Sequence, residues 1–149
     1  MTSCSQLSIR NVQFVIRGRA MVSLLIVSHS AQLAAGVREF ASQVSGGKVQ
    51  IVDAGGTDDG SLGTSIDRIK LGLQQAASPD GTLVLVDIGG AVLSVEMAIE
   101  ELQLTHVYIS DAPLVEGAYL AALEASVEAS LEETAEAALQ GREMVKVHR

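Results

Sequence analysis

Four short runs of apolar residues are spread along the chain, and each is followed by small or polar residues. They cover 21–27, 49–52, 82–86 and 107–109. Short runs that are apolar at most positions are typical of strands buried on both faces, as in a parallel sheet. The run at 82–86, Thr-Leu-Val-Leu-Val, is the most hydrophobic of the four. We therefore expect it to lie inside the sheet.

Between these runs, apolar residues recur at intervals of three and four, the spacing of one helix face. The helical stretches fall at about 33–44, 66–77, 91–102 and 114–145. The last should break near Ser130, because Ser130 followed by Glu133 has the capping-box pattern that starts a new helix. Alternating strands and helices predict right-handed crossovers. The expected fold is α/β, an open and mainly parallel sheet of order 2-1-3-4 with helices on both faces.

The first twenty residues do not follow this pattern. Residues 1–20 have no sustained periodicity, and no apolar run in them is long enough for a signal-peptide core or a membrane span. We therefore expect 1–20 to be a non-structural leader and 21–149 to form one domain. Aromatic residues make up only 3% of the chain and Trp is absent. The core must therefore be built from Val, Ile, Leu and Ala.

The charge of the chain limits the partners that it can bind. Its formal net charge is -8, and residues 1–20 hold three arginines and no acid, so residues 21–149 carry -11. A protein with this much negative charge is not expected to bind nucleic acid, because it would repel the phosphates. The charge suits a cytoplasmic protein. Cys4 is the only cysteine, which excludes a disulfide framework and a thiolate metal site. We expect no bound metal and no cofactor.

Two strand ends carry the candidate chemistry. The first strand runs into Ser28-His29-Ser30, and the third runs into Asp87. In the order 2-1-3-4 these strands are neighbours whose loops diverge, so a crevice forms at their carboxyl ends. His29 and Asp87 should therefore face each other. A carboxylate that accepts a hydrogen bond from one ring nitrogen fixes the tautomer and leaves the other nitrogen as a nucleophile.

Other interpretations of these residues remain open. Asp87 could instead cap the third helix. A serine hydrolase is disfavoured, because Ser28 and Ser30 adjoin His29 in sequence and no G-x-S-x-G motif occurs. His106 precedes a strand and His148 lies in the tail, so both are expected to be structural or superficial.

The loop at 55–65 is rich in glycine and acid. It lacks the lysine of a P-loop, and its two aspartates would repel a nucleotide. The loop could still offer backbone N–H groups near Gly63 and Thr64 to a phosphoryl group. Thr64 or Ser65 is expected to cap the following helix.

Four segments, each weak by itself, occur here in a distinctive order. They are VSLLIVSHS at 22–30, GGTDDGSLGTS at 55–65, VLVDIGGAVLSVE at 84–96 and APLVEGA at 112–118. Together they resemble the mannose family of enzyme IIA domains of the bacterial phosphotransferase system. Within that fold, they are most similar to the phosphoryl-transfer subunits of PEP-dependent dihydroxyacetone kinases. The resemblance runs from 21 to about 139.

The resemblance implies that His29 accepts a phosphoryl group from the phosphocarrier protein HPr and that Asp87 orients the ring. The group then passes to ADP held in a partner subunit of the kinase. Small residues around the histidine should leave room for the phosphoryl group and donate hydrogen bonds to it; they are Ser28, Ser30, Gly89 and Gly90. The resemblance also implies a homodimer whose apolar interface, from the third or fourth helix, leaves His29 exposed.

Two other functions remain possible at this level. The chain could be a sugar-transport enzyme IIA of the mannose family, which would pass the group to a transporter-associated domain. It could also be a regulatory domain that responds to phosphorylation. The loop at 55–65 and the segment at 112–118 favour the kinase subunit over the sugar-transport enzyme.

Overall fold

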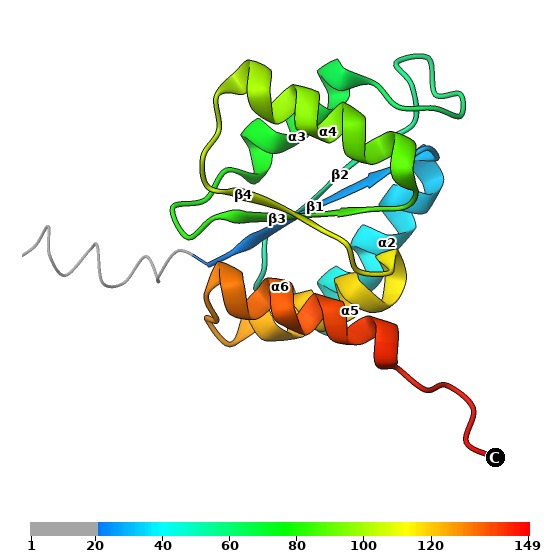
Figure 1. The fold of residues 1–149 in the computed structure, drawn as a ribbon, viewed down its shortest axis with the longest axis vertical. Helices are drawn as coiled ribbons and strands as arrows, with labels where there is room; N and C mark the ends of the chain where they lie inside the picture. The colour runs from blue at the N-terminus through cyan, green and yellow to red at the C-terminus, as the bar shows by residue number, and fades with distance from the viewer. Residues whose placement is uncertain (1–20) are drawn as a thin grey trace, which may run out of the picture.

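A computed structural model describes residues 21–149, which form a four-stranded, wholly parallel sheet (Figure 1). The strands are β1 (Ser23–Ser28), β2 (Ile51–Gly55), β3 (Thr82–Val86) and β4 (Val107–Ser110). Their order is β2-β1-β3-β4. The predicted α/β class and the strand order 2-1-3-4 are therefore confirmed, and β3 lies inside the sheet as expected. The predicted leader, 1–20, lies outside the described residues.

Within residues 21–149, five α-helices and one short 3-10 helix connect and cover the strands. They are α2 (Ala31–Val44), α3 (Ile66–Ala76), α4 (Gly89–Leu102), α5 (Leu114–Ser126), α6 (Leu131–Leu139) and η1 (Gln140–Glu143). The break at Ser130 is confirmed, because the amide of Glu133 donates to Ser130 Oγ at 3.1 Å and the amide of Ser130 donates back to the Glu133 carboxylate at 3.1 Å.

Three predicted elements have different bounds in the structure. The first strand covers Ser23–Ser28 and not 21–27. The last helix ends at Leu139 and not near 145, because the chain tightens into η1, where buried Gly141 lies close to the backbone of Gly117. The second strand covers Ile51–Gly55 and not 49–52. Asp53 looked like the end of the apolar run. The backbone of β2 nevertheless pairs with β1 through Asp53 as far as Gly55, and the Asp53 side chain reaches Arg38 at 2.8 Å.

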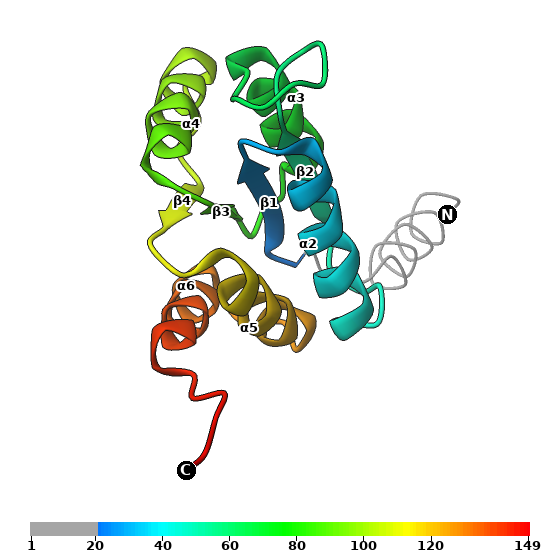
Figure 2. The same cartoon turned by 90° about the vertical axis from the view of Figure 1, so that its right-hand side faces the viewer.

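The helices form two layers, with α3 and α4 on one face of the sheet and α2, α5 and α6 on the other (Figure 2). Side chains of a strand alternate between the two faces. Leu24 and Ile26 accordingly belong to one core cluster, and Leu25 and Val27 to the other. The core is aliphatic, as composition predicted. On α5 its members are all alanines: Ala118, Ala121, Ala122 and Ala125.

All four strands run in the same direction, so their carboxyl ends meet at one edge, on the right in Figure 1. The loop between β2 and α3 and the starts of α2, α4 and α5 gather at this carboxyl edge. Within residues 21–149, no helix combines the length and apolar character needed to cross a bilayer.

Candidate functional site

His29 and Asp87 meet at the carboxyl edge. β1 and β3 are paired up to Val27 and Val86, and the amide of Asp87 still donates to the carbonyl of Val27 at 3.2 Å. The residues that follow the two strands are thereby held side by side. His29 Nδ1 lies 3.0 Å from Asp87 Oδ1 and 3.3 Å from Oδ2. The predicted juxtaposition of this pair, far apart in sequence, is confirmed.

The carboxylate of Asp87 is held by several donors at once. Burial alone would raise its pKa, but the pKa is lowered overall, because hydrogen bonds from the amides of His29 and Ile88, the Ser28 hydroxyl and the His29 ring favour the charged form. The amides of His29 and Ile88 donate at 2.8 and 2.7 Å, and the Ser28 hydroxyl donates at 2.9 Å. Asp87 is therefore ionised at neutral pH and can only accept hydrogen bonds.

This arrangement decides which ring nitrogen is free. Since Asp87 can only accept, Nδ1 of His29 must carry the proton and donate it. The lone pair of the neutral ring then lies on Nε2. A β-carbon on Gly90 would come within 3.2 Å of Nε2, so the absence of a side chain at Gly90 keeps this nitrogen open. The His29 side chain is 31% exposed, and a group brought from outside can reach it.

Ser28 and Ser30, predicted to lie around the histidine, have separate positions. Ser28 is fully buried, donates to Asp87 and accepts from the amide of Ser30 at 3.0 Å. Ser30 is the N-cap of α2, where its Oγ accepts from the amide of Leu33 at 3.1 Å. Both serines therefore fix the turn that carries His29 from β1 into α2.

Gly63 and Thr64 approach the same turn from the loop after β2. The amide of Gly63 donates to the carbonyl of His29 at 2.8 Å, which ties the loop to the histidine backbone. Thr64 Oγ1 lies 2.9 Å from Ser94 Oγ on α4. Of the two candidate caps for α3, Ser65 is the one that occupies the N-cap position. Ser94 was not a predicted site residue; its place one turn after Gly90 was the available signal.

The start of α4 faces the histidine. Gly89 and Gly90 are its first residues, and its N-cap is Ile88, which makes no side-chain cap bond. The alternative prediction, that Asp87 caps this helix, was wrong, since Asp87 precedes the cap and bonds to His29. Backbone N–H groups at a helix start attract anions. Next to Nε2, they are suited to the oxygens of a phosphoryl group.

The loop between β2 and α3 is internally hydrogen-bonded. The amide of Thr57 donates to the carbonyl of Ser61 at 3.0 Å, and the Asp59 carboxylate accepts from the Thr57 hydroxyl at 2.6 Å. Hydroxyl hydrogen bonds from Ser61 and Thr57 lower the pKa of Asp59 to about 2. Asp59 thus acts within the loop, which is held in one shape.

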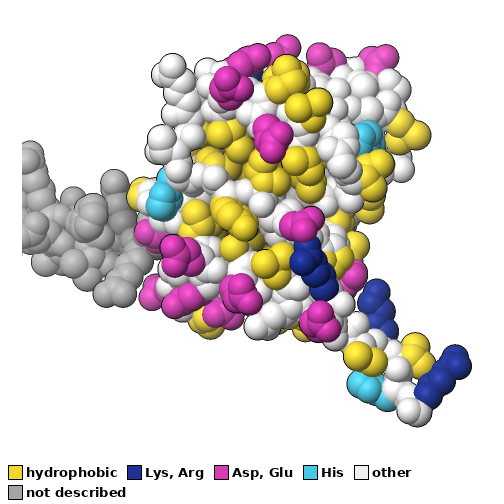
Figure 3. Space-filling view, viewed as in Figure 1, with side chains coloured by type: hydrophobic (Ala, Val, Ile, Leu, Met, Phe, Trp, Pro, Cys, Tyr) yellow, Lys and Arg dark blue, Asp and Glu magenta, His cyan; other side chains and the backbone are white. Residues whose placement is uncertain are grey.

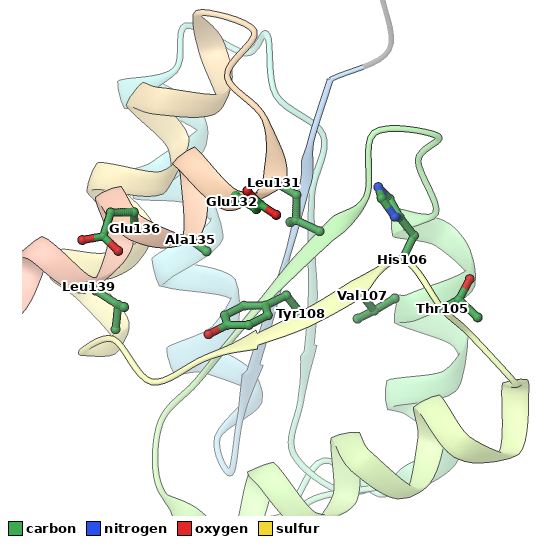
Figure 4. A pocket seen from close by; sticks show the side chains of 9 residues that line it. All are labelled: Thr105, His106, Val107, Tyr108, Leu131, Glu132, Ala135, Glu136 and Leu139. Carbon is green, nitrogen blue, oxygen red and sulfur yellow. The ribbon is translucent and has the colours of Figure 1, made fainter.

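The other histidines lie elsewhere. His106 directly precedes β4, at the opposite edge of the sheet from His29. It borders a cavity of about 370 Å³ between β4 and α6, with Tyr108, Leu131 and Glu136 among its other lining residues (Figure 4). His148 lies in the exposed tail. Within 21–149, no three His, Cys, Asp or Glu side chains gather closely enough to hold a metal ion.

Comparisons with known proteins identify the family of this chain. The family model described as "PTS system fructose IIA component" (EIIA-man) matches residues 23–135. The chain is 39% identical over 115 residues to the phosphoryl donor subunit DhaM of PEP-dependent dihydroxyacetone kinase 2 from Listeria innocua, covering 75% of this chain and 92% of that protein.

A longer relative and a solved structure extend the comparison. The chain is 38% identical to DhaM of Klebsiella michiganensis over 135 residues. The aligned region covers 85% of this chain but only 28% of that protein. It is also similar to a crystal structure of a protein of unknown function, with a TM-score of 0.72 and 35% identity over 80% of this chain and 94% of that one. The chain belongs to the EIIA-man family of phosphotransferase-system domains, and the two relatives from Listeria innocua and Klebsiella michiganensis are DhaM subunits.

Proposed function

We propose that this chain is a phosphoryl carrier of a dihydroxyacetone kinase system, acting in the cytoplasm. It accepts a phosphoryl group on Nε2 of His29 from the phosphocarrier HPr and passes it to ADP bound in a partner subunit. The observation that carries the proposal is the ionised Asp87 carboxylate 3.0 Å from Nδ1, which leaves Nε2 free beside Gly90. The relatives named as phosphoryl donor subunits supply the substrate class.

The proposed transfer to His29 is a nucleophilic displacement at phosphorus. The lone pair of Nε2 attacks, a new P–N bond forms, and the bond between phosphorus and the donor atom breaks with its electron pair returning to the donor. The proton on Nδ1 stays in place, so the phosphorylated ring gains positive charge. The Asp87 carboxylate stabilises that charge, because opposite charges at hydrogen-bond distance attract most strongly away from bulk water.

The surroundings of Nε2 support the phosphoryl group in this proposal. The first N–H groups of α4, at Gly89 and Gly90, are available to donate hydrogen bonds to its oxygens. Thr64, from the loop before α3, and Ser94, on α4, add two hydroxyl groups that hydrogen-bond to each other at 2.9 Å. Ser28, Ser30 and Gly63 hold the backbone of His29. Such positioning and charge stabilisation are the main requirements of phosphoryl transfer.

The proposal is tested by incubating the chain with phosphoenolpyruvate, enzyme I and HPr, and measuring its intact mass. We expect a gain of one phosphoryl group, which acid removes because phosphohistidine is acid-labile. Adding the ADP-loaded kinase subunit should discharge the protein and form ATP, whereas free ADP alone should not. No gain of mass from phosphorylated HPr would contradict the proposal. Rapid discharge to free ADP would indicate an autonomous kinase instead.

The proposal includes a homodimer that leaves His29 exposed. Of the two predicted interface helices, α5 fits better, because α4 begins at the site. Val115 and Leu123 on α5 are large apolar residues that remain partly exposed in the single chain. Sedimentation equilibrium at micromolar concentration should give the mass of a dimer, and a monomer there would contradict this part of the proposal.

A further inference from the structure

A fully buried serine ends the strand that leads into His29. Ser28 is the last residue of β1, and no part of it is exposed. The ring of His29 beside it reaches the surface, and Figure 3 shows histidine surface at the right-hand end of the molecule, where the carboxyl edge lies. Burying a hydroxyl group costs free energy unless the group is hydrogen-bonded. The partners of the Ser28 hydroxyl therefore indicate what a polar residue does at this position.

The Ser28 hydroxyl is engaged both as an acceptor and as a donor. Its oxygen accepts from the amide of Ser30 at 3.0 Å and lies 2.9 Å from Oδ2 of Asp87. An ionised carboxylate can only accept, so the single hydrogen of the hydroxyl must point at Asp87. No hydrogen of Ser28 is then left for a phosphoryl oxygen. The side chain of Ser28 therefore acts on Asp87.

The donors to Asp87 are divided between its two oxygens. Oδ2 accepts from the amide of His29 at 2.8 Å and from the Ser28 hydroxyl. Oδ1 accepts from the amide of Ile88 at 2.7 Å and lies 3.0 Å from Nδ1 of the His29 ring. The carboxylate cannot rotate about its Cβ–Cγ bond without breaking the bonds to Oδ2. The two donors to Oδ2 thereby keep Oδ1 directed at the ring.

Ser28 differs in kind from the other donors to this carboxylate. The amides of His29 and Ile88 belong to the backbone, and the His29 ring is the reacting group itself. Among residues 21–149, Ser28 is thus the only side chain outside the reacting pair that donates to Asp87. Its contribution can be removed by substitution while both members of the pair stay in place.

We infer that Ser28 is a positioning residue for phosphoryl transfer, whose hydroxyl fixes the orientation of the Asp87 carboxylate and thereby keeps the proton of His29 on Nδ1. The inference deepens the proposed function and rests on it. As the P–N bond forms, the ring gains positive charge. A carboxylate that is already in place stabilises this charge without reorganising. A carboxylate free to turn would also let the proton move to Nε2, where it blocks the lone pair that attacks phosphorus.

The test measures kcat and KM for phosphorylated HPr with three variants. Ser28→Ala should lower kcat about tenfold and leave KM little changed, because Ser28 orients a group that acts in the transfer step. Ser28→Cys fills the space of the hydroxyl with a weak donor, so it should also be slow if Ser28→Ala does not fold. Ser45→Ala is the control. Ser45 is likewise buried, but its hydroxyl donates to the carbonyl of Ser42 at the far end of α2, and its loss should change neither constant.

A double variant shows whether Ser28 acts through Asp87. In the Asp87→Asn background, adding Ser28→Ala should slow transfer less than twofold further, since residues that act through one another are not additive. Two effects that multiply in full would overturn the inference. A kcat for Ser28→Ala and Ser28→Cys equal to that of wild type would overturn it as well, and so would a change confined to KM.

The tautomer of His29 gives a readout that needs no phosphoryl donor. Nitrogen-15 NMR of the neutral ring distinguishes the nitrogen that carries the proton. Wild type and Ser45→Ala should show the proton on Nδ1, and Ser28→Ala should shift population toward the Nε2–H form. Slower transfer with an unchanged tautomer would show that Ser28 only holds the fold, and the inference would be wrong. Failure of phosphorylated HPr to charge the wild type would instead contradict the proposed function.

Discussion

Among single residues, His29 is the one whose chemistry the fold leaves accessible. It is the only histidine of the three that follows a strand at the carboxyl edge. His29→Ala should abolish phosphorylation by phosphorylated HPr while leaving the fold intact, because the partly exposed ring adds little to the core. Intact mass and peptide mapping check this. His148→Ala is the matched control and should behave as wild type. A phosphoryl group mapped to His106 or His148 would contradict the assignment.

The rate of transfer should depend on the charge of Asp87 and on the several hydrogen bonds that its carboxylate accepts. Asp87→Asn keeps the size of the side chain, but an amide has one acceptor oxygen where the carboxylate has two, and it cannot balance the charge of a phosphorylated ring. We expect transfer to slow by roughly tenfold to a thousandfold with the fold retained. Single-turnover rates from phosphorylated HPr measure this effect. A rate within twofold of wild type would contradict the role of Asp87.

The same carboxylate should contribute to the acid sensitivity of the fold. Its pKa is lowered in the folded chain below the ordinary value of 3.8. A carboxyl group whose pKa is lower in the folded state stabilises that state at pH values above the pKa of the unfolded chain. This stabilisation is lost as the pH falls through the pKa of the folded chain. Below about pH 4, wild type should therefore lose stability more steeply than Asp87→Asn. Urea unfolding at a series of pH values checks this, and parallel curves would contradict it.

For the elements, the start of α4 offers a matched pair of substitutions. A β-carbon on Gly90 would lie 3.2 Å from Nε2 of His29, whereas one on Gly89 would have nothing within 4 Å. Replacing Gly by Ala in a helix stabilises it by about 0.5–1 kcal/mol where space allows. Gly89→Ala should therefore be neutral or mildly stabilising and remain active. Gly90→Ala should keep the fold but slow phosphorylation, since its methyl group occupies the approach to Nε2.

Thermal unfolding and phosphorylation rates distinguish these outcomes. Equal rates for the two variants would show that space at Gly90 does not limit the transfer. A loss of stability in Gly90→Ala alone would indicate that the new methyl group displaces the His29 ring. A crystal structure of the variant would then show a longer distance between His29 Nδ1 and the Asp87 carboxylate.

For the whole molecule, the acidic surface should govern the encounter with HPr. Residues 21–149 carry -11, and a field of this sign attracts a basic face and repels nucleotide phosphates. The association rate with HPr should therefore fall as salt rises from about 0.01 to 0.15 M, over which the Debye length shrinks from about 30 to 8 Å. Titration calorimetry with ADP or ATP alone should show no tight binding. A salt-independent association rate would contradict electrostatic steering.

Local sequence patterns determined much of this molecule. Apolar runs placed the four strands, and three- and four-residue spacing placed the helices, because burial on one or two faces dictates these periods. The pattern Ser130 to Glu133 marked a helix start correctly, since capping depends only on neighbouring atoms. The order of the strands, with His29 and Asp87 at adjacent ends, was expected as that of a doubly wound α/β sheet of order 2-1-3-4.

Tertiary structure decided what depends on contacts between distant segments. Strand β2 extends through Asp53 because its backbone pairs with β1 as far as Gly55, and α6 ends early because Gly141 lies against the first turn of α5 at Gly117. The choice of Nε2 as the open nitrogen depends on the position of Asp87 relative to Nδ1 and on Gly90 beside Nε2, which only the packed sheet fixes.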